Sequence, residues 1–263
     1  MLLAVDVGNT NTVFALYRDQ TKLGQWRIST VRERTSDEYA AALMQLIHLA
    51  GFDYQEISNT IISSVVPQAI LPLRWICRDY LDCPALVIGD DIGVPIDIEL
   101  ENPREVGSDR LVNAFAAHNR YGGPLIIVDF GTATTFDVVG PEGSYQGGAI
   151  APGINLSLEA LHRAAAKLPR IAVDKPQAVV GRSTVSAMQS GIFWGYVGLI
   201  EGIVSRIRAE TGQSMKTIGT GGLANLFAGS TDAIEYVDKD LTMVGMVDIF
   251  HARRASPPPK DPG

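Results

Sequence analysis

Cysteine and histidine are scarce in this sequence, whose 263 residues include two cysteines and four histidines. Cys77 and Cys83 cannot supply the several disulfides of a small secreted domain, and the scattered histidines lack the spacing of a zinc site. We therefore expect ordinary buried thiols in a reducing compartment. His118 and His162 are expected to be solvated or core histidines on helices rather than ligands.

Long hydrophobic runs and a targeting segment are also missing. The amino-terminal stretch reaches Asp6 without any basic region before it, so we expect no signal peptide. The longest apolar run, residues 191–200, ends at Glu201 and covers about half of a membrane span. These features predict a cytoplasmic protein with no membrane partner.

Positive charge is outnumbered, with 22 Lys and Arg against 29 Asp and Glu and a net charge of −7 at pH 7. Such a surface repels phosphate backbones, which argues against nucleic acid as a partner. A small anionic ligand stays compatible with it, because local backbone N–H groups bind phosphate whatever the net charge. The sequence has no G-x-x-x-x-G-K-[ST] string, so it is not a P-loop protein.

Strand-like apolar runs alternate with helix-like segments, a pattern typical of an α/β fold. The segment 35–50 predicts a helix with Ser36 or Asp37 as its N-cap and Gly51 as its C-terminal stop. The proline-rich end, residues 253–263, predicts a disordered tail. Strands are expected at 2–5, 13–17, 61–66, 85–88 and 125–128, and further helices at 71–81 and 110–121.

One local pattern occurs twice. An apolar strand is followed by Asp-x-Gly, then by small hydroxyl and amide residues, then by a second apolar strand, first at Asp6 and again at Asp129. Two related domains explain this repeat, and we expect them at 1–120 and 121–252. A third glycine-rich segment, residues 218–224, predicts a strand-to-helix turn in the second domain that can lie flat against a nucleoside.

The repeated turn has the composition of a phosphate site. A glycine turn after a strand lets the backbone approach a ligand, and its successive N–H groups form an anion-binding concavity. Asp6 and Asp129 follow strands, where α/β proteins bind ligands. A carboxylate beside a polyphosphate requires a cation between them, so Asp6 is a candidate Mg²⁺ partner. A pair of ordinary Asp-Gly hairpin turns is the alternative explanation, which the repetition disfavours.

Together these residues resemble the actin-like ATPase and sugar-kinase superfamily, and within it type III pantothenate kinases. Four segments carry the resemblance, in order from residue 1 to about residue 250: DVGNTN at 6–11, NPREVGSDR at 102–110, DFGTATT at 129–135 and GGAIAPG at 147–153. The resemblance implies two ribonuclease-H-like domains, each a mixed sheet flanked by helices, with a nucleotide cleft between them. It also implies transfer of phosphate from ATP to pantothenate, the first step of coenzyme A biosynthesis, in a homodimer that needs Mg²⁺ and K⁺ or ammonium.

The resemblance also implies roles for individual residues. ATP phosphates would be held by the first turn, assisted by Thr132 from the second; that turn comprises Asp6, Val7, Gly8, Asn9, Thr10, Asn11, Thr12 and Val13. The pantothenate site would be lined by Gly107, Ser108, Asp109, Arg110 and Thr184. Asp109 would be the general base, Asp129 the ligand of the monovalent cation and Asp6 the partner of Mg²⁺. Leu100 departs from the family pattern, since relatives often have a tyrosine there that touches pantothenate.

General chemistry agrees with these roles. An ordinary Asp side chain is ionised at neutral pH. In phosphoryl transfer the base needs only to orient the acceptor hydroxyl and to take its proton, which a carboxylate can do. Arg110 can pair with the carboxylate of pantothenate. As alternatives, Asp109 and Arg110 form a local ion pair at a helix start, and Asp129 is only a buried turn-former.

A stripe of glycines at 191, 195, 198 and 202 predicts close approach of a second helix, either within the chain or in a dimer. Two other functions remain open at this point. One is a catalytically idle relative that serves as a regulatory or transcription accessory protein, although such a protein needs no base at position 109. The other is a kinase of acetate or a sugar, which the Gly-Ser-Asp-Arg string and the short chain disfavour.

Overall fold

The computed structural model describes residues 1–164 and 168–255 and contains two five-stranded sheets. Its contacts divide the chain into two compact units. Unit 1 consists of Met1–Pro95, Arg104–Ala116 and the chain from Thr242 onward, and unit 2 consists of Ile96–Pro103 and Ala117–Leu241. The predicted α/β class with two mixed sheets flanked by helices is confirmed.

The sheet of unit 1 has β1 (Leu2–Val7) at its centre, and its strand order is β3-β2-β1-β4-β5. β1 is antiparallel to β2 (Asn11–Arg18) and parallel to β4 (Asn59–Ser64). β3 (Thr21–Ser29) and the short β5 (Ala85–Val87) form its edges. Because β1 and β4 are parallel, their carboxyl ends lie at the same end of the sheet. Asp6 is next to the last residue of β1 and therefore lies at this carboxyl end.

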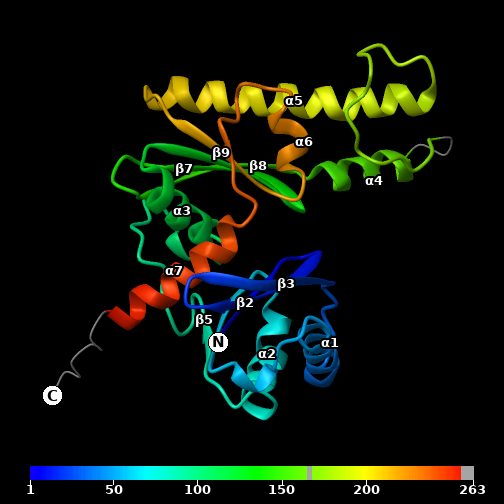
Figure 1. Ribbon diagram of the computed structural model, residues 1–263. Helices are drawn as coiled ribbons and strands as arrows, with labels where there is room; N and C mark the ends of the chain where they lie inside the picture. The colour runs from blue at the N-terminus through cyan, green and yellow to red at the C-terminus, as the bar shows by residue number, and fades with distance from the viewer. Residues whose placement is uncertain (165–167, 256–263) are drawn as a thin grey trace. The chain divides into compact units, whose positions relative to one another are not determined.

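Helices cover both faces of this sheet. α1 (Ser36–Leu49) and α2 (Pro67–Asp79) pack in one apolar cluster with Leu3, Val5 and Phe14, and Figure 1 shows the two helices side by side. On the other face, α3 (Ser108–Tyr121) and α7 (Leu241–Ala255) contribute to a cluster with Leu2 and Ala4. The alternation of buried side chains along β1 therefore serves two cores, as expected for a strand that is covered on both sides.

Unit 2 repeats the arrangement of unit 1. Its sheet has the order β10-β9-β6-β7-β8, with β6 (Leu125–Phe130) antiparallel to β7 (Ala133–Val139) and parallel to β9 (Lys216–Gly221). β8 (Tyr145–Pro152) and β10 (Tyr236–Val237) form the edges. The helices are α4 (Ile154–Ala164), the long α5 (Thr184–Thr211) and the short α6 (Ala224–Ala228), and α5 and α6 share a core with β6 and β7 (Figure 1). β1 and β6 are thus structurally equivalent strands, which explains the repeat in the sequence.

Most predicted elements are found, with shifted ends. The N-cap of α1 is Thr35 rather than Ser36 or Asp37, because Thr35 and Glu38 complete a capping box one residue earlier. Gly51 follows α1 with a φ of +81°, as a C-terminal stop requires. β3 has no counterpart among the predicted elements, since its half-exposed residues lack an apolar run. Short 3₁₀ turns occur at Tyr54–Glu56 and Pro103–Glu105.

The compact units differ from the predicted ranges 1–120 and 121–252 at two places. The switch within α3 falls after Ala116, and α7 belongs to unit 1. The physical reason for the second difference is that Met246, Val247 and Phe250 of α7 are buried in the cluster of the first sheet. Of the predicted tail, residues 253–255 belong to the last turn of α7, and residues 256–263 lie outside the described residues.

Candidate functional site

The first Asp-x-Gly turn is held by backbone bonds and by one threonine of a neighbouring strand. The Gly8 N–H donates to the Asn11 carbonyl at 2.9 Å, which closes the turn between β1 and β2. Thr30, just after β3, donates its N–H to the Thr10 carbonyl at 2.9 Å and its hydroxyl to the Gly8 carbonyl at 2.8 Å. The turn is therefore rigid while Asn9, Thr10 and Asn11 are exposed.

The flanking residues of this turn have a different environment. Val7, Thr12 and Val13 are buried, and the Thr12 hydroxyl shares a hydrogen bond of 2.9 Å with the Thr30 hydroxyl. Their side chains pack within the fold and hold the strands together. Thr30 was missed in the sequence analysis, because its position beside the turn depends on the register of β3, which the sequence does not display.

Asp109 lies close to the carboxyl end of the sheet where Asp6 is found, although the two residues are far apart in sequence. Asp6 is paired in register with Ser63 on β4. The Ser63 hydroxyl is 3.1 Å from the hydroxyl of Ser108, the first residue of α3, and Asp109 follows it. One strand pairing and one hydrogen bond therefore connect the first turn with the start of α3. Ser63 is a further missed residue, which the hydroxyl pair at the end of a predicted strand could have indicated.

The Asp109 carboxylate is positioned by its local backbone. Its Oδ1 accepts the Arg110 N–H at 2.8 Å, and a Cβ at Gly107 would lie only 2.5 Å from that oxygen. Position 107 therefore has to be glycine for the carboxylate to take this position. The Gly107 carbonyl accepts the Arg110 N–H at 3.1 Å and begins the helix. Asp109 and Arg110 are both partly exposed, as residues that meet a substrate need to be.

The second turn has an analogous construction in unit 2. Asp129 on β6 is in register with Thr135 on β7 and Thr220 on β9. The Gly131 N–H donates to the Ala133 carbonyl at 3.0 Å, which closes a turn one residue shorter than the first. Gly221 has a φ of +86°, and a Cβ there would lie 2.5 Å from the Asp129 Oδ1. The predicted strand-to-helix turn of residues 218–224 is confirmed, and it packs directly against Asp129.

The end of the 147–153 segment meets the second turn. Thr132 is exposed, and its carbonyl accepts the Gly153 N–H at 3.1 Å, so the end of the 147–153 segment is fixed to it. Leu100 lies against the same segment, since its Cδ2 is 3.2 Å from where a Cβ of Gly147 would be. The region around Thr132 is therefore built from two of the segments singled out in the sequence, 129–135 and 147–153.

A buried carboxylate supports the strand beside Asp129. Asp137 on β7 is fully buried and accepts hydrogen bonds of 2.8 Å from the Thr135 hydroxyl and from the Tyr145 hydroxyl. Thr135 is the register partner of Asp129. Asp137 and Tyr145 were missed, because a polar residue in a strand gives no indication in sequence that it is buried.

Thr184 is exposed on the first turn of α5, directly after the N-cap Ser183. A capping box between Ser183 and Ser186 fixes this helix start. The role of Thr184 remains a prediction.

The donor set around Asp6 is suited to one kind of metal. Within residues 1–164 and 168–255, no group of three or more His, Cys, Asp or Glu side chains could enclose an ion. Mg²⁺ is commonly held by one or two carboxylates, with phosphate oxygens and water as its other ligands. A single carboxylate beside an exposed polar turn therefore fits Mg²⁺ that arrives with a nucleotide. Over the same described residues, no helix is long and apolar enough to cross a membrane.

Comparison with known proteins gives the family. The family model for type III pantothenate kinase matches residues 2–206. A type III pantothenate kinase from Paramagnetospirillum magneticum is 57% identical over 258 residues, covering 98% of this chain and 99% of that protein. A type III pantothenate kinase from Rhodospirillum rubrum is 57% identical over 254 residues, covering 96% of this chain and 98% of that protein.

Solved structures agree on the fold. A protein from Sinorhizobium meliloti, assigned as a 2-dehydro-3-deoxygalactonokinase, superposes with a TM-score of 0.62 at 12% identity, covering 100% of this chain and 99% of its own. At such identity the likeness concerns the fold alone, which is that of the actin-like ATPases and sugar kinases. The sequence relatives extend over nearly the full length of the chain, and they decide the assignment: the chain belongs to the type III pantothenate kinases, phosphotransferases that phosphorylate pantothenate in coenzyme A biosynthesis.

Proposed function

We propose that the chain transfers the γ-phosphoryl group of ATP to the terminal hydroxyl of pantothenate, giving 4'-phosphopantothenate, with Asp109 as the general base. The observation that carries this proposal is the Ser63–Ser108 hydrogen bond of 3.1 Å, which ties the start of α3 to the strand next to Asp6. The Asp109 carboxylate for the acceptor and the 6–13 turn for the donor phosphates are then held at the carboxyl end of the same sheet.

Asp109 acts on the hydroxyl in this proposal. Its carboxylate accepts the hydroxyl proton as the oxygen attacks phosphorus, and the bond from phosphorus to the bridging oxygen of ADP breaks. Arg110 pairs with the carboxylate of pantothenate, and Gly107 and Ser108 line the same substrate. Thr184 contributes a further hydroxyl to it. The partial exposure of residues 107–110 supports contact with a substrate.

The turn of residues 6–13 binds the ATP phosphates, assisted by Thr132. The exposed Asn9, Thr10 and Asn11 carry polar groups without positive charge, and the rigid turn presents them at no cost in ordering. Asp6 would hold Mg²⁺, which neutralises developing charge on the phosphates when it is bound. The buried Val7, Thr12 and Val13 keep the turn in shape.

Turnover tests this proposal directly. Release of ADP at saturating Mg-ATP is expected to depend on pantothenate and on K⁺ or ammonium, and to fall when Na⁺ replaces them. Release of ADP with acetate or a sugar in place of pantothenate would contradict the substrate assignment. Absence of turnover with pantothenate, despite measurable ATP binding, would instead favour the regulatory accessory alternative.

Asp129 binds the monovalent cation in this proposal. The close approach of Gly221 supports it, because a Cβ at position 221 would lie 2.5 Å from the Asp129 Oδ1 and would cover that oxygen, whereas glycine leaves it uncovered on this side. Replacing Asp129 by Asn removes one unit charge, whose attraction for a cation is on the order of 1–4 kcal/mol near a protein surface. We expect the K⁺ concentration for half-maximal activity to rise about tenfold or more.

A K⁺ titration of initial rates measures this effect. Glu142→Gln is the matched control, since Glu142 is an exposed carboxylate of the same unit, and its titration is expected to equal that of the unmodified chain. An unchanged K⁺ requirement in Asp129→Asn would remove Asp129 from the cation site.

The partner that fits the glycine stripe of α5 is a second copy of the chain. Among the described residues, a Cβ at Gly191, Gly195 or Gly198 would have no neighbour within 4 Å, whereas a Cβ at Gly202 would lie 3.1 Å from the Arg206 side chain. The opposite side buries Phe193, Val197 and other apolar residues. Alanine would stabilise the helix by about 1 kcal/mol relative to glycine at each of these positions. Close approach of a partner helix would explain why glycine is present instead.

Gly198→Leu tests the homodimer. The added side chain meets open space within the chain, so the fold is expected to persist while the sedimentation mass falls from that of a dimer to that of a monomer. Glu210→Leu, an exposed position on the last turns of α5 away from the stripe, is expected to stay dimeric. A dimeric Gly198→Leu chain would place the interface elsewhere.

A further inference from the structure

The two cysteines lie together at the end of α2. Asp82 adopts a left-handed φ of 47°, which turns the chain back so that the Cys83 N–H donates to the Cys77 carbonyl at 2.9 Å. Standard bond lengths then limit the distance between the two Cα atoms to roughly 6.8 Å, within the range that a disulfide spans. The two thiols are close enough for each to shift the pKa of the other.

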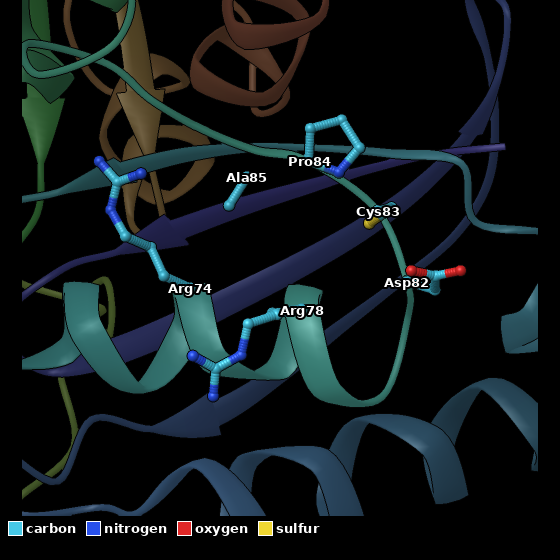
Figure 2. Close-up of a pocket in the computed structure, with 6 residues that line it drawn as sticks. All are labelled: Arg74, Arg78, Asp82, Cys83, Pro84 and Ala85. Carbon is cyan, nitrogen blue, oxygen red and sulfur yellow. The ribbon is translucent and has the colours of Figure 1, made fainter.

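Only one of the thiols faces an opening in the surface. A cavity of about 470 Å³ is lined by Arg74, Arg78, Asp82, Cys83, Pro84 and Ala85. Figure 2 shows Arg74 and Arg78 extending from α2, opposite the segment that carries Cys83 into β5. Cys83 is 8% exposed, whereas Cys77 is 3% exposed and does not line the cavity. A small reagent can therefore reach Cys83 first.

The surroundings of Cys83 favour its thiolate. The Cys77 S–H and the hydroxyl of the fully buried Thr60, 3.3 Å away, stabilise a negative charge on the Cys83 sulfur and lower the pKa of its thiol. Burial and the carboxylate of Asp82 act against this lowering of the pKa, whereas the positive charge of the amino terminus contributes to the lowering. The hydrogen bond to Cys83 and burial raise the pKa of the Cys77 thiol. Arg74 and Arg78, which line the cavity, are paired with Asp91 and Asp79.

We propose that Cys83 and Cys77 form a peroxide-sensitive dithiol, in which Cys83 is the attacking sulfur and Cys77 the resolving one. The Cys83 thiolate attacks one oxygen of a hydroperoxide, the O–O bond breaks, and the second oxygen leaves as an alcohol or water after taking up a proton. The Cys77 sulfur then attacks the Cys83 sulfenic acid and forms the S–S bond. The S–O bond breaks, and the departing hydroxide takes the Cys77 proton and leaves as water. The peroxide is reduced by two electrons and the dithiol is oxidised by two.

Exposure of the full chain to hydrogen peroxide tests the assignment. Both thiols are expected to disappear together, the intact mass to fall by two hydrogen atoms, and a thiol reductant to restore both. In Cys77→Ser, one sulfenic acid per chain is expected on Cys83, trapped by dimedone. In Cys83→Ser, oxidation is expected to be about tenfold slower or more, because the remaining thiol is buried and its pKa is raised.

A second measurement needs no variant at the cysteines. The alkylation rate of Cys83 in the unmodified chain is expected to rise with pH at a midpoint below about 8.5, the ordinary pKa of a cysteine thiol. Thr60→Val keeps the volume at position 60 and removes the hydroxyl, so the midpoint is expected to move upward. Two titratable thiols after peroxide treatment of the folded chain, disulfides between chains, or equal reactivity of Cys83→Ser would each overturn the proposal. None of these readouts depends on kinase activity.

Discussion

Asp109→Asn is expected to lower kcat by about 10²–10⁴, the range typical of loss of a general base. The amide keeps an oxygen where the Asp109 Oδ1 accepts the Arg110 N–H at 2.8 Å, so the start of α3 is retained. Its amide oxygen is far too weakly basic to take a proton from a hydroxyl at neutral pH. ATP binding is expected to stay unchanged, because the role proposed for Asp109 concerns the acceptor hydroxyl.

Initial rates of ADP release and a separate ATP-binding titration measure the two effects. The matched control is Glu105→Gln, which neutralises an exposed carboxylate in the 3₁₀ turn just before α3 and is expected to leave both unchanged. Near-normal turnover of Asp109→Asn would leave that residue a role in helix capping alone. Loss of ATP binding in the same variant would indicate a disturbed fold rather than a missing base.

If Asp6 holds Mg²⁺ as proposed, Asp6→Asn is expected to reduce kcat/KM for Mg-ATP by about a hundredfold, since a metal that loses a charged protein ligand stabilises the transition state by about 3 kcal/mol less. The backbone pairing of Asp6 with Val13 and Ser63 does not need the charge, so the sheet is expected to stay intact. Higher Mg²⁺ is expected to recover part of the activity.

An Mg²⁺ titration at fixed ATP, with circular dichroism as a check of the fold, tests this expectation. Asp19→Asn serves as the control at the opposite end of the same strand pair. Asp19 has a φ of +53°, which asparagine also tolerates, and its substitution is expected to have no effect on the titration. Equal Mg²⁺ requirements in Asp6→Asn and Asp19→Asn would exclude Asp6 from the metal site.

Local patterns were sufficient for the class of fold. The apolar run before Asp6 and the one before Asp129 indicated buried strands, and their repetition indicated two similar sheets, both of which the structure contains. The exposed edge strand β3 escaped prediction because half-buried residues carry a weak apolar signal. Its end supplies Thr30, so a missed strand also meant a missed residue of the turn.

The glycines show how far residue identity leads. Gly107 and Gly221 stand out in the sequence only as members of motifs. In the structure, a Cβ at position 107 would lie 2.5 Å from the Asp109 Oδ1, and position 221 has a φ of +86° with the Phe130 backbone 2.8 Å from where a Cβ would be. Such a contact joins two residues in a bend or on adjacent strands, and its distance depends on φ and on register. Position in the sequence therefore indicated that these glycines matter, and the coordinates explained why.

The sequence by itself determined features that depend on neighbours along the chain: the buried strands and several helices, the Asp-x-Gly turns, and the family to which their order points. What only the tertiary structure decided depends on pairs far apart in sequence. Ser63 meets Ser108, α7 returns to the first sheet, and Cys83 gains both a cavity and the Thr60 hydroxyl. Strand register and helix packing create these contacts, and both are properties of the whole folded chain, because every strand shifts its side chains to the other face when its register moves by one residue.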